Sequence, residues 1–424
     1  MSSETGPRDP VLRVTIGRDE GLEASTMDVR LRDKTEIGAE PGPRASEIVR
    51  IELWIFSYPM VGVGPGGIDV TGAKSERTRL AVRMETRDGA RGAYVGGQAN
   101  ALAQAAACAR AVLGLDAFAR ERAYERIRRQ LRKEDRMGAG VIDVAMWDLA
   151  GHRLGLSVSQ MLGGNKTRLP AYASTWFGGE GGGLTTPEAF ADFAEECYEL
   201  GYRGFKMHGW TDGSPTRDAA AVRLLGQRIG DRMALMHDAA CHLRSFADAL
   251  EVGRACDDAN FFWYEDPYSD GGLAAHAHRR LREMLKTPIL LGEHVRGLES
   301  MATLTIADGT DFVRADPDFD IGITGTMKIA HFAEALGLDV ELHAPGPAHR
   351  HCMASIRNTN FYELSMVGPS RGNFNAPVYA CGYSDALDDV GADGCFPVPE
   401  GPGLGVRYDW DYITRNAKSH VVIE

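Results

Sequence analysis

The sequence lacks the features that would place the protein in or across a membrane. No apolar run approaches the roughly 18–20 residues that a membrane-spanning helix needs. The first residues, MSSETGPRDP, do not place a basic stretch before an apolar one, as a secretory signal would. We therefore predict a cytoplasmic protein without a membrane partner.

An excess of basic residues is also missing. The chain has 47 Lys and Arg against 59 Asp and Glu, which gives a net charge of −12. Because nucleic-acid phosphates require a basic surface, this balance argues against a nucleic-acid partner. It does not exclude an acidic substrate, since a bound divalent cation reverses the local field.

Paired cysteines are absent as well. The seven cysteines are scattered and odd in number, and none form a CxxC pair. We predict neither a disulfide framework nor a zinc site. The glycine-rich stretch GVGPGGIDVTGAKS lacks a Lys-Ser or Lys-Thr step that runs into a helix, so we interpret it as a lid and not as a nucleotide-binding loop.

The remaining sequence divides into four segments. Residues 1–47 are rich in Gly, Pro and charge, which is typical of an arm or of disorder. Residues 48–165 combine alternating strands, such as IVRIELWIFSYP, with helical periodicity after residue 100, which predicts a small α+β domain. We expect the tail, residues 368–424, to fold back onto that domain.

Residues 166–367 show a different sequence pattern, in which short apolar runs alternate with amphipathic segments. Eight strands alternating with helices predict an α/β fold with a closed parallel barrel. The runs are LPAYAST (169–175), RGFKMHG (203–209), MALMHD (233–238), FFWYED (261–266), PILLGE (288–293), DFVRAD (311–316), LDVELH (338–343) and NFYEL (360–364).

Ionisable residues stand at the ends of seven successive predicted strands, where such barrels carry their chemistry. They are Lys206 and His208, Asp238, Glu265, Glu293, Asp316, His343 and Glu363. Three adjacent carboxylates would repel one another without a cation. Their all-oxygen ligand set favours Mg²⁺ held by Asp238, Glu265 and Glu293.

Candidate proton-transfer groups flank this triad on both sides. Lys206 and His208 are two residues apart on one strand, so both point to the same face. His343 approaches from the opposite side, and Asp316 on the neighbouring strand can orient its imidazole.

Together these residues resemble the enolase superfamily, in its mandelate racemase and muconate lactonizing enzyme-like branch. The ordered set Lys-x-His, Asp, Glu, Glu, Asp, His, Glu is similar to the family order, and AGVIDVAMWDLAGHRLGLSVSQMLGG looks like the branch's signature helix. The resemblance implies an N-terminal α+β capping domain, a (β/α)7β modified TIM barrel and one Mg²⁺ per subunit. It also implies a homo-oligomer, from dimer to octamer, and a protonated Glu363 that donates a hydrogen bond to the developing oxyanion.

The sequence departs from the family pattern at two positions. The usual second motif is Lys-x-Lys, and here His208 replaces the second lysine, so the base on that face is either His208 by position or Lys206 by chemistry. Ala240 stands where many relatives have a polar residue.

The resemblance implies removal of a proton next to a carboxylate, and we favour dehydration of a small acid sugar by a hydro-lyase. A racemase or epimerase, a lactone cycloisomerase and a catalytically silent relative remain as alternatives. The polar rim offers candidate substrate-binding residues, namely Ser174, Trp176, His294, Arg296, His349 and Arg350. Strand alternation also predicts that Arg314 and Glu341 point into the barrel and pair with each other or with Asp316.

Overall fold

The computed structural model describes residues 11–15, 26–30, 44–63, 69–164, 166–179, 183–269, 271–369 and 375–424. The chain separates into two units, Met1–Arg44 and Ala45–Glu424. In the first unit, β1 (Val11–Thr15) pairs antiparallel with β2 (Thr26–Arg30). The rest of this unit up to residue 43 lies outside the described residues.

The second unit begins with an antiparallel sheet of order β15-β3-β4-β5. Its strands are β3 (Ile48–Val63), β4 (Asp69–Thr86), β5 (Arg91–Gly96) and β15 (Ala417–Ile423). Ile51 and Leu53 of β3 are two residues apart on one face of the strand, and both are fully buried. The strands β3 and β4 extend into the predicted glycine-rich lid, of which residues 64–68 lie outside the described residues.

Helices cover this sheet and connect it to the barrel. They are η2 (Ala99–Ala101), α1 (Leu102–Val112), α2 (Arg120–Gln130), α3 (Gly140–Leu154) and α4 (Val158–Met161). The first twelve residues of α3 are all buried, because α3 packs against β5 on one side and against the barrel on the other. At Gly140 a Cβ atom would come within 2.1 Å of the Asp318 carbonyl oxygen, so only glycine permits this approach.

The described residues form eight parallel barrel strands in the order β12-β11-β10-β9-β8-β7-β6-β13, and β14 pairs antiparallel with β6. All eight sequence runs become strands, and the fold is the expected modified TIM barrel. The strands are β6 (Arg168–Thr175), β7 (Gly204–His208), β8 (Ala234–Asp238), β9 (Trp263–Glu265), β10 (Ile289–Leu291), β11 (Phe312–Ala315), β12 (Val340–Leu342) and β13 (Tyr362–Val367).

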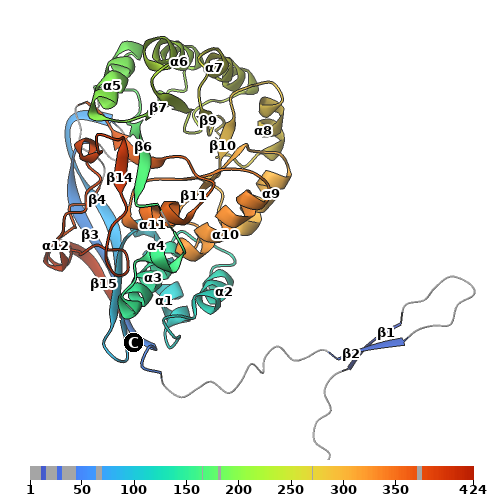
Figure 1. Ribbon diagram of the computed structural model, residues 1–424, viewed down its shortest axis with the longest axis vertical. Helices are drawn as coiled ribbons and strands as arrows, with labels where there is room; N and C mark the ends of the chain where they lie inside the picture. The colour runs from blue at the N-terminus through green and yellow to red at the C-terminus, as the bar shows by residue number, and fades with distance from the viewer. Residues whose placement is uncertain are drawn as a thin grey trace, which may run out of the picture. The chain divides into compact units, whose positions relative to one another are not determined.

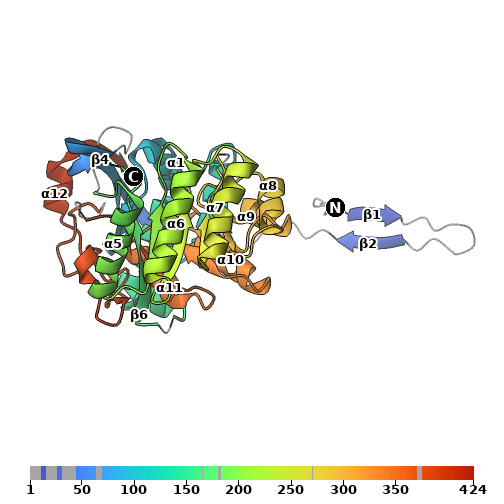
Figure 2. The ribbon, with the colours of Figure 1, turned by 90° about the horizontal axis from the view of Figure 1, so that it is seen from above.

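An outer layer of helices surrounds these strands, as Figure 1 shows and as the side-by-side α5, α6 and α7 in Figure 2 confirm. Thr186 and Ser245 begin two of the helices as N-caps, accepting hydrogen bonds from backbone N–H groups of the first turn. The helices are α5 (Pro187–Leu200), α6 (Pro215–Ile229), α7 (Phe246–Asp258), α8 (Ala275–Arg282), α9 (Leu298–Ile306), α10 (Gly322–Ala335) and α11 (Pro347–Ser355).

The seam between the end strands β12 and β13 is bridged by the side chain of Glu341. Its carboxylate accepts hydrogen bonds from the backbone N–H groups of Asn360 (3.0 Å) and Phe361 (3.2 Å) and from the Asn360 amide (2.7 Å). The prediction that Glu341 pairs with Arg314 or with Asp316 is therefore wrong. Backbone donors at the seam take the place of the expected cation.

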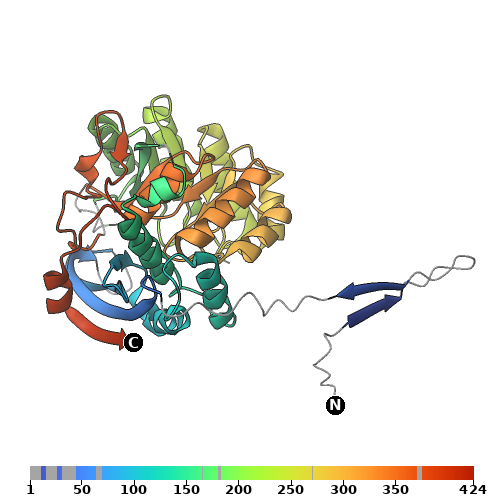
Figure 3. The same cartoon turned by 60° about the horizontal axis from the view of Figure 1, so that its bottom comes forward.

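The C-terminal segment returns to the first sheet after leaving the barrel. It contains η4 (Leu387–Asp389), β14 (Cys395–Pro397) and α12 (Trp410–Arg415). Figure 3 shows the red strand β15 running along the blue strands, and in the register His420 faces Trp54 of β3. None of the described helices is both long and apolar enough to cross a membrane.

Candidate active site at the carboxyl ends of the barrel strands

The strand register brings the predicted site residues to one level of the barrel. On β7 and β8, His208 lies opposite Asp238, and on β8 and β9, Asp238 lies opposite Glu265. Glu293 follows β10 by two residues. Parallel strands in register place their last residues side by side, so these groups meet at the carboxyl end of the barrel.

Asp238, Glu265 and Glu293 form a cluster whose carboxylate oxygens lie within 4.8 Å of one another. Asp238 and Glu265 are buried, whereas Glu293 is partly exposed. One side of the cluster is therefore open to a ligand. The donor set contains only carboxylate oxygens, which is the chemistry that Mg²⁺ prefers, so these residues fit a magnesium ion.

Lys206 lies at the centre of the buried carboxylates and is 1% exposed. Its Nζ atom lies 2.9 Å from Glu265, 3.0 Å from Glu363 and 3.2 Å from Asp238. Burial lowers the pKa of Lys206, but the charges of Glu265 and Glu363 outweigh burial and raise it well above its usual value. In this arrangement Lys206 is a cation.

His208 is held between two acceptors. Its Nδ1 lies 2.6 Å from the Thr175 carbonyl oxygen, and its Nε2 lies 3.0 Å from Asp238 Oδ2. Burial lowers the pKa of His208, but the neighbouring carboxylates, chiefly Asp238, raise it above its usual value. Two acceptors at the two ring nitrogens favour the doubly protonated imidazolium.

On the opposite side, Asp316 and His343 form a tight pair. The Nδ1 of His343 lies 2.6 Å from Asp316 Oδ2, and its Nε2 points toward the triad, 3.6 Å from Glu293. Burial lowers the pKa of His343, but Glu293 and Asp316 raise it to about 9. With a side chain 23% exposed, His343 is more accessible than Lys206 and faces the open side of the triad.

Glu363 is surrounded by positive charge. Besides Lys206, the Nη2 of Arg314 lies 3.1 Å from its Oε2, which also accepts the Ala344 N–H at 2.8 Å. Burial raises the pKa of Glu363, but Lys206 and Arg314 lower it well below its usual value. These neighbours favour the carboxylate form, in contrast to the protonated form that the resemblance implies.

Arg314 points into the barrel, as strand alternation predicts, but its partners differ from those expected. It is fully buried and pairs with Glu265 (2.9 Å), Glu363 (3.1 Å) and the Tyr172 hydroxyl (3.1 Å). The sequence could not predict these partners, because they lie on strands β9, β13 and β6 across the barrel.

The predicted substrate-binding residues do not all reach one surface. Ser174, on β6, and Trp176, just after β6, are both buried. His349 is also buried, and its Nε2 lies 3.2 Å from Asp316, so it supports the Asp316–His343 pair. Arg350 lies elsewhere, bound to Asp385 at 2.5 Å and to two carbonyl oxygens of the C-terminal segment. We therefore withdraw Arg350 from the candidates.

His294 and Arg296 line a hollow of about 310 Å³ between the barrel rim and the first sheet's helices. Sequence reasoning missed the other residues of its wall, which come from the turn after β5, from η2, from the start of α1 and from the loop before α3, and which meet the barrel rim only in the folded chain. They are Gln98, Asn100, Ala101, Gln104, Asp135 and Met137.

The loop after β11 holds the first sheet against this rim, and two of its aspartates, Asp318 and Asp320, were not predicted from the sequence. Asp318 accepts hydrogen bonds from the Tyr94 hydroxyl (2.7 Å) and the Gly97 N–H (2.8 Å). Asp320 accepts from the backbone N–H groups of Asp316 and Gly297, both at 2.9 Å. The sequence DPDFD thus fixes Asp316 and the hollow's wall together.

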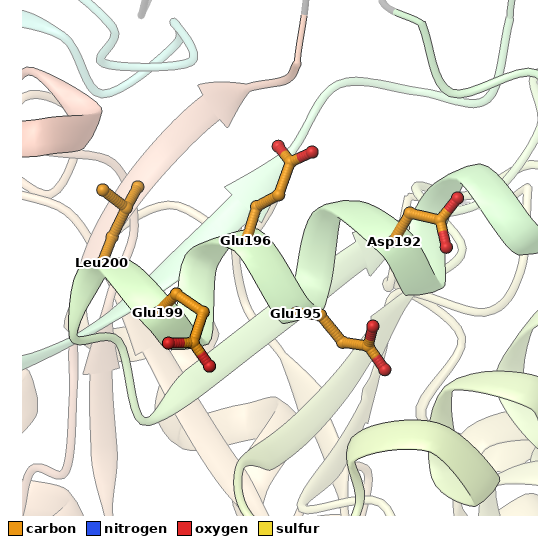
Figure 4. Close-up of a pocket in the computed structure, with 5 residues that line it drawn as sticks. All are labelled: Asp192, Glu195, Glu196, Glu199 and Leu200. Atoms are coloured by element: carbon orange, nitrogen blue, oxygen red, sulfur yellow. The ribbon is translucent and has the colours of Figure 1, made fainter.

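A second hollow lies on the outside of α5, away from the strand ends that carry the site (Figure 4). Its wall is formed by Asp192, Glu195, Glu196, Glu199 and Leu200. Arg228 of α6 pairs with Asp192 and Glu195, both at 2.6 Å. This acidic face has the contacts of a solvated helix surface, and we assign it no function.

Two family models match the chain over most of its length. The model described as "Enolase C-terminal domain-like" matches residues 189–412. The model described as "Mandelate racemase / muconate lactonizing enzyme, N-terminal domain" matches residues 53–163.

Individual relatives are similar at low identity. D-gluconate dehydratase of Thermoproteus tenax is 26% identical over 288 residues, which are 64% of this chain and 54% of that protein. The 3,6-anhydro-alpha-L-galactonate cycloisomerase of Streptomyces coelicolor is 27% identical over 82% of this chain and 93% of its own length. The crystal structure of D-glucarate dehydratase from Agrobacterium tumefaciens complexed with magnesium superposes with a TM-score of 0.77 at 25% identity, covering 89% of this chain and 100% of that one.

Proposed function

Because the chain belongs to the mandelate racemase and muconate lactonizing enzyme branch of the enolase superfamily, we propose that it removes the α-proton of a carboxylic acid with one Mg²⁺ per subunit, and that the acid is a sugar acid that loses water. One observation carries the proposal. An oxygen-only triad lies between the Asp316–His343 pair on one side and Lys206 with His208 on the other.

Asp238, Glu265 and Glu293 would hold the cation, which supplies positive charge to the substrate carboxylate and to the charge that develops as the α-proton leaves. The relative from Agrobacterium tumefaciens contains magnesium, which supports this choice of metal. Burial raises the pKa of Glu265, and the nearby Arg314 and Lys206 oppose that rise, whereas the same two cations lower the pKa of Glu363.

His343 is the group that we assign to the leaving hydroxyl. Asp316 is not a member of the triad, so its hydrogen bond still raises the pKa of His343 when a cation shares Glu293, and this favours an imidazolium that can donate a proton from Nε2 as the carbon–oxygen bond breaks. Asp316 holds Nδ1 and thereby aims Nε2 at the open side of the triad. Asp316 itself is fixed by His349 and by the Asp318 N–H.

Lys206 and His208 are the candidates for removing the α-proton from the other face. Sharing Asp238 and Glu265 with a cation would weaken the attraction that raises the pKa values of both side chains, which favours their neutral forms. Lys206 contacts both of these carboxylates, whereas His208 contacts only Asp238. The choice between the two bases stays open.

Dehydration is favoured over the alternatives for two reasons. A protonated His343 can donate a proton to a leaving hydroxyl. The hollow lined by His294, whose Nε2 lies 4.0 Å from Glu293 of the triad, also carries the side-chain amides of Gln98, Asn100 and Gln104, which suit a polyol chain. Dehydratases of gluconate and glucarate are among the similar proteins. Racemisation and cycloisomerisation remain the second candidates, because a cycloisomerase is also among them.

Product analysis tests the proposal. The chain is incubated with Mg²⁺ and a panel of hexonic and hexaric acids, and products are identified by mass and by NMR. We expect one or more acids to lose water and form a 2-keto acid. Inversion of configuration would indicate an epimerase, and ring formation or opening would indicate a cycloisomerase. Recovery of every acid unchanged would contradict the proposal and favour a silent acid-binding relative.

A further inference from the structure

The three strand ends that carry the triad also carry a second set of ligand-forming side chains. Cys241, Asp266 and His294 follow β8, β9 and β10, and each stands one or three residues beyond a member of the triad. One sulfur, one carboxylate oxygen and one imidazole nitrogen of this set lie within 4.8 Å of one another. We call it the rim cluster.

Asp266 is the buried member of the rim cluster. It is 1% exposed, and neither of its carboxylate oxygens accepts a hydrogen bond from any of the described residues. A buried carboxylate without donors is costly, and such groups are normally satisfied by a partner or an ion. The imidazole Nε2 of His294 lies 3.5 Å from Oδ2 of Asp266.

The backbone holds the cluster in place. The Cys241 N–H donates to the Asp266 carbonyl oxygen at 2.7 Å, and the Ala239 N–H donates to the Glu265 carbonyl oxygen at 3.1 Å. These bonds fix the loop after β8 against the loop after β9. At Gly272 a Cβ atom would stand 3.2 Å from Asp266 Oδ1, so the missing side chain leaves space beside the carboxylate.

We propose that Cys241, Asp266 and His294 form a second cation site that takes a thiophilic divalent ion of the zinc type. A thiolate and an imidazole are ligands that Zn²⁺ and Co²⁺ prefer and that Mg²⁺ avoids, so the two neighbouring sites select different metals. Three protein ligands leave a fourth position for water or a ligand. The sequence predicts no zinc site, because the three ligands are far apart in the chain and no CxxC pair marks them.

A bound ion would also fix one wall of the hollow between the rim and the first sheet. His294 lines that hollow, and its side chain is 42% exposed. Coordination to the ion would hold the ring beside Asp266 and restrict its rotation toward the hollow. The proposal therefore extends beyond the proton-removing site and does not depend on the reaction proposed for it.

Cobalt(II) titration of the full chain in excess Mg²⁺ tests the site, because a cobalt–thiolate pair has a charge-transfer absorption in the near ultraviolet. We expect the wild type to bind one Co²⁺ per chain with this band. Cys241→Ser should lose the band. Cys395→Ser and Cys381→Ser, which alter other partly exposed cysteines, should keep it. Asp266→Asn should weaken Co²⁺ binding at least about tenfold.

Controls separate the site from folding and from the proposed reaction. Near-ultraviolet circular dichroism of each variant shows whether it retains the native packing. Glu293→Gln, which weakens the magnesium triad, should still show the band. Absence of the band in folded wild type, loss of the band in Cys395→Ser but not in Cys241→Ser, or unchanged affinity in folded Asp266→Asn would overturn the proposal. None of these outcomes depends on turnover.

Discussion

At the scale of single residues, the site is organised by carboxylates that are shared between cations. Glu265 contacts both Lys206 and Arg314, and Glu363 contacts the same two side chains. Each charge is buried, so each depends on its partners to remain ionised. Removing one cation therefore affects more than one carboxylate.

Asp316→Asn tests the pairing with His343. We expect kcat to fall about 10²–10⁴-fold, because the imidazolium loses the partner that aims and stabilises it. Since Asp316 helps to raise the pKa of His343 to about 9, the loss of activity at alkaline pH should begin at a lower pH in the variant. The pH dependence of kcat checks this. An alkaline limb that stays in place would show that another group donates the proton.

Arg314→Met tests the buried cation network. The variant removes a positive charge that pairs with the buried carboxylates of Glu265 and Glu363. We therefore expect the free energy of unfolding to fall by about 3–5 kcal/mol, measured by denaturant titration. Arg357→Met is the matched control, since its side chain is 82% exposed and pairs with Glu334 at the surface. The control should change the free energy of unfolding by about 1 kcal/mol or less. Equal effects of the two substitutions would contradict this account.

At the scale of elements, the seam of the barrel depends on a side chain. The carboxylate of Glu341 on β12 accepts hydrogen bonds from the backbone N–H groups of the two residues that precede β13. Burial raises the pKa of this carboxyl to about 7, despite the hydrogen bonds from Asn360 that lower it. The folded chain therefore keeps a proton that the unfolded chain releases, between pH about 4.5 and 7.

The sign of the pH effect follows from this difference. Because the folded state binds more protons than the unfolded state in that interval, Glu341 makes stability decrease as pH rises from about 4.5 to about 7. The glutamine in Glu341→Gln cannot titrate. The fall in the free energy of unfolding over this pH interval should therefore be smaller in the variant than in the wild type, by up to about 3 kcal/mol. Denaturation curves at pH 5 and 8 for both proteins measure it. An identical pH dependence in both would contradict the assignment.

The strands and their polar ends were predictable from the sequence, whereas the contacts across the barrel were not. In a run such as MALMHD, the apolar residues belong to a strand that packs in the barrel, and the final carboxylate lies at the rim. Both features are visible in the sequence of a single strand. Arg314 could be assigned to the interior by alternation alone. Its partners Glu265 and Glu363 depend on barrel closure, and no local pattern encodes that distance.

At the scale of the whole molecule, the first sheet and the barrel are one unit tied together at the site. Asp318 binds the end of β5, and Asp143 of α3 accepts hydrogen bonds from Thr324 of α10 at 2.7 and 2.9 Å. The amides of the hollow come from the first sheet's side, and the triad comes from the barrel. The sequence predicted both parts, but it could not predict the hollow, because its wall is formed only when they meet.

Mg²⁺ should stabilise the entire folded unit, since its ligands belong to three strands that are absent from the unfolded chain. At a Mg²⁺ concentration about one hundred times the Kd, the expected gain is about 2.7 kcal/mol. Thermal unfolding with and without Mg²⁺ measures the shift in midpoint. Glu293→Gln removes a ligand at the accessible edge of the triad and should reduce the shift. A Mg²⁺ effect of the same size in this variant would contradict the assignment of Glu293.

The central claim is that this site removes the proton next to a carboxylate. Exchange of that proton is followed by NMR in deuterated water, with Mg²⁺ and an acid that the product analysis identifies. The account predicts that deuterium appears at the α-carbon or that the α-proton signal is lost with water elimination. It also predicts that a chelator or Glu293→Gln stops either change. An α-proton lost at the same rate without Mg²⁺, or with the triad disrupted, would contradict it.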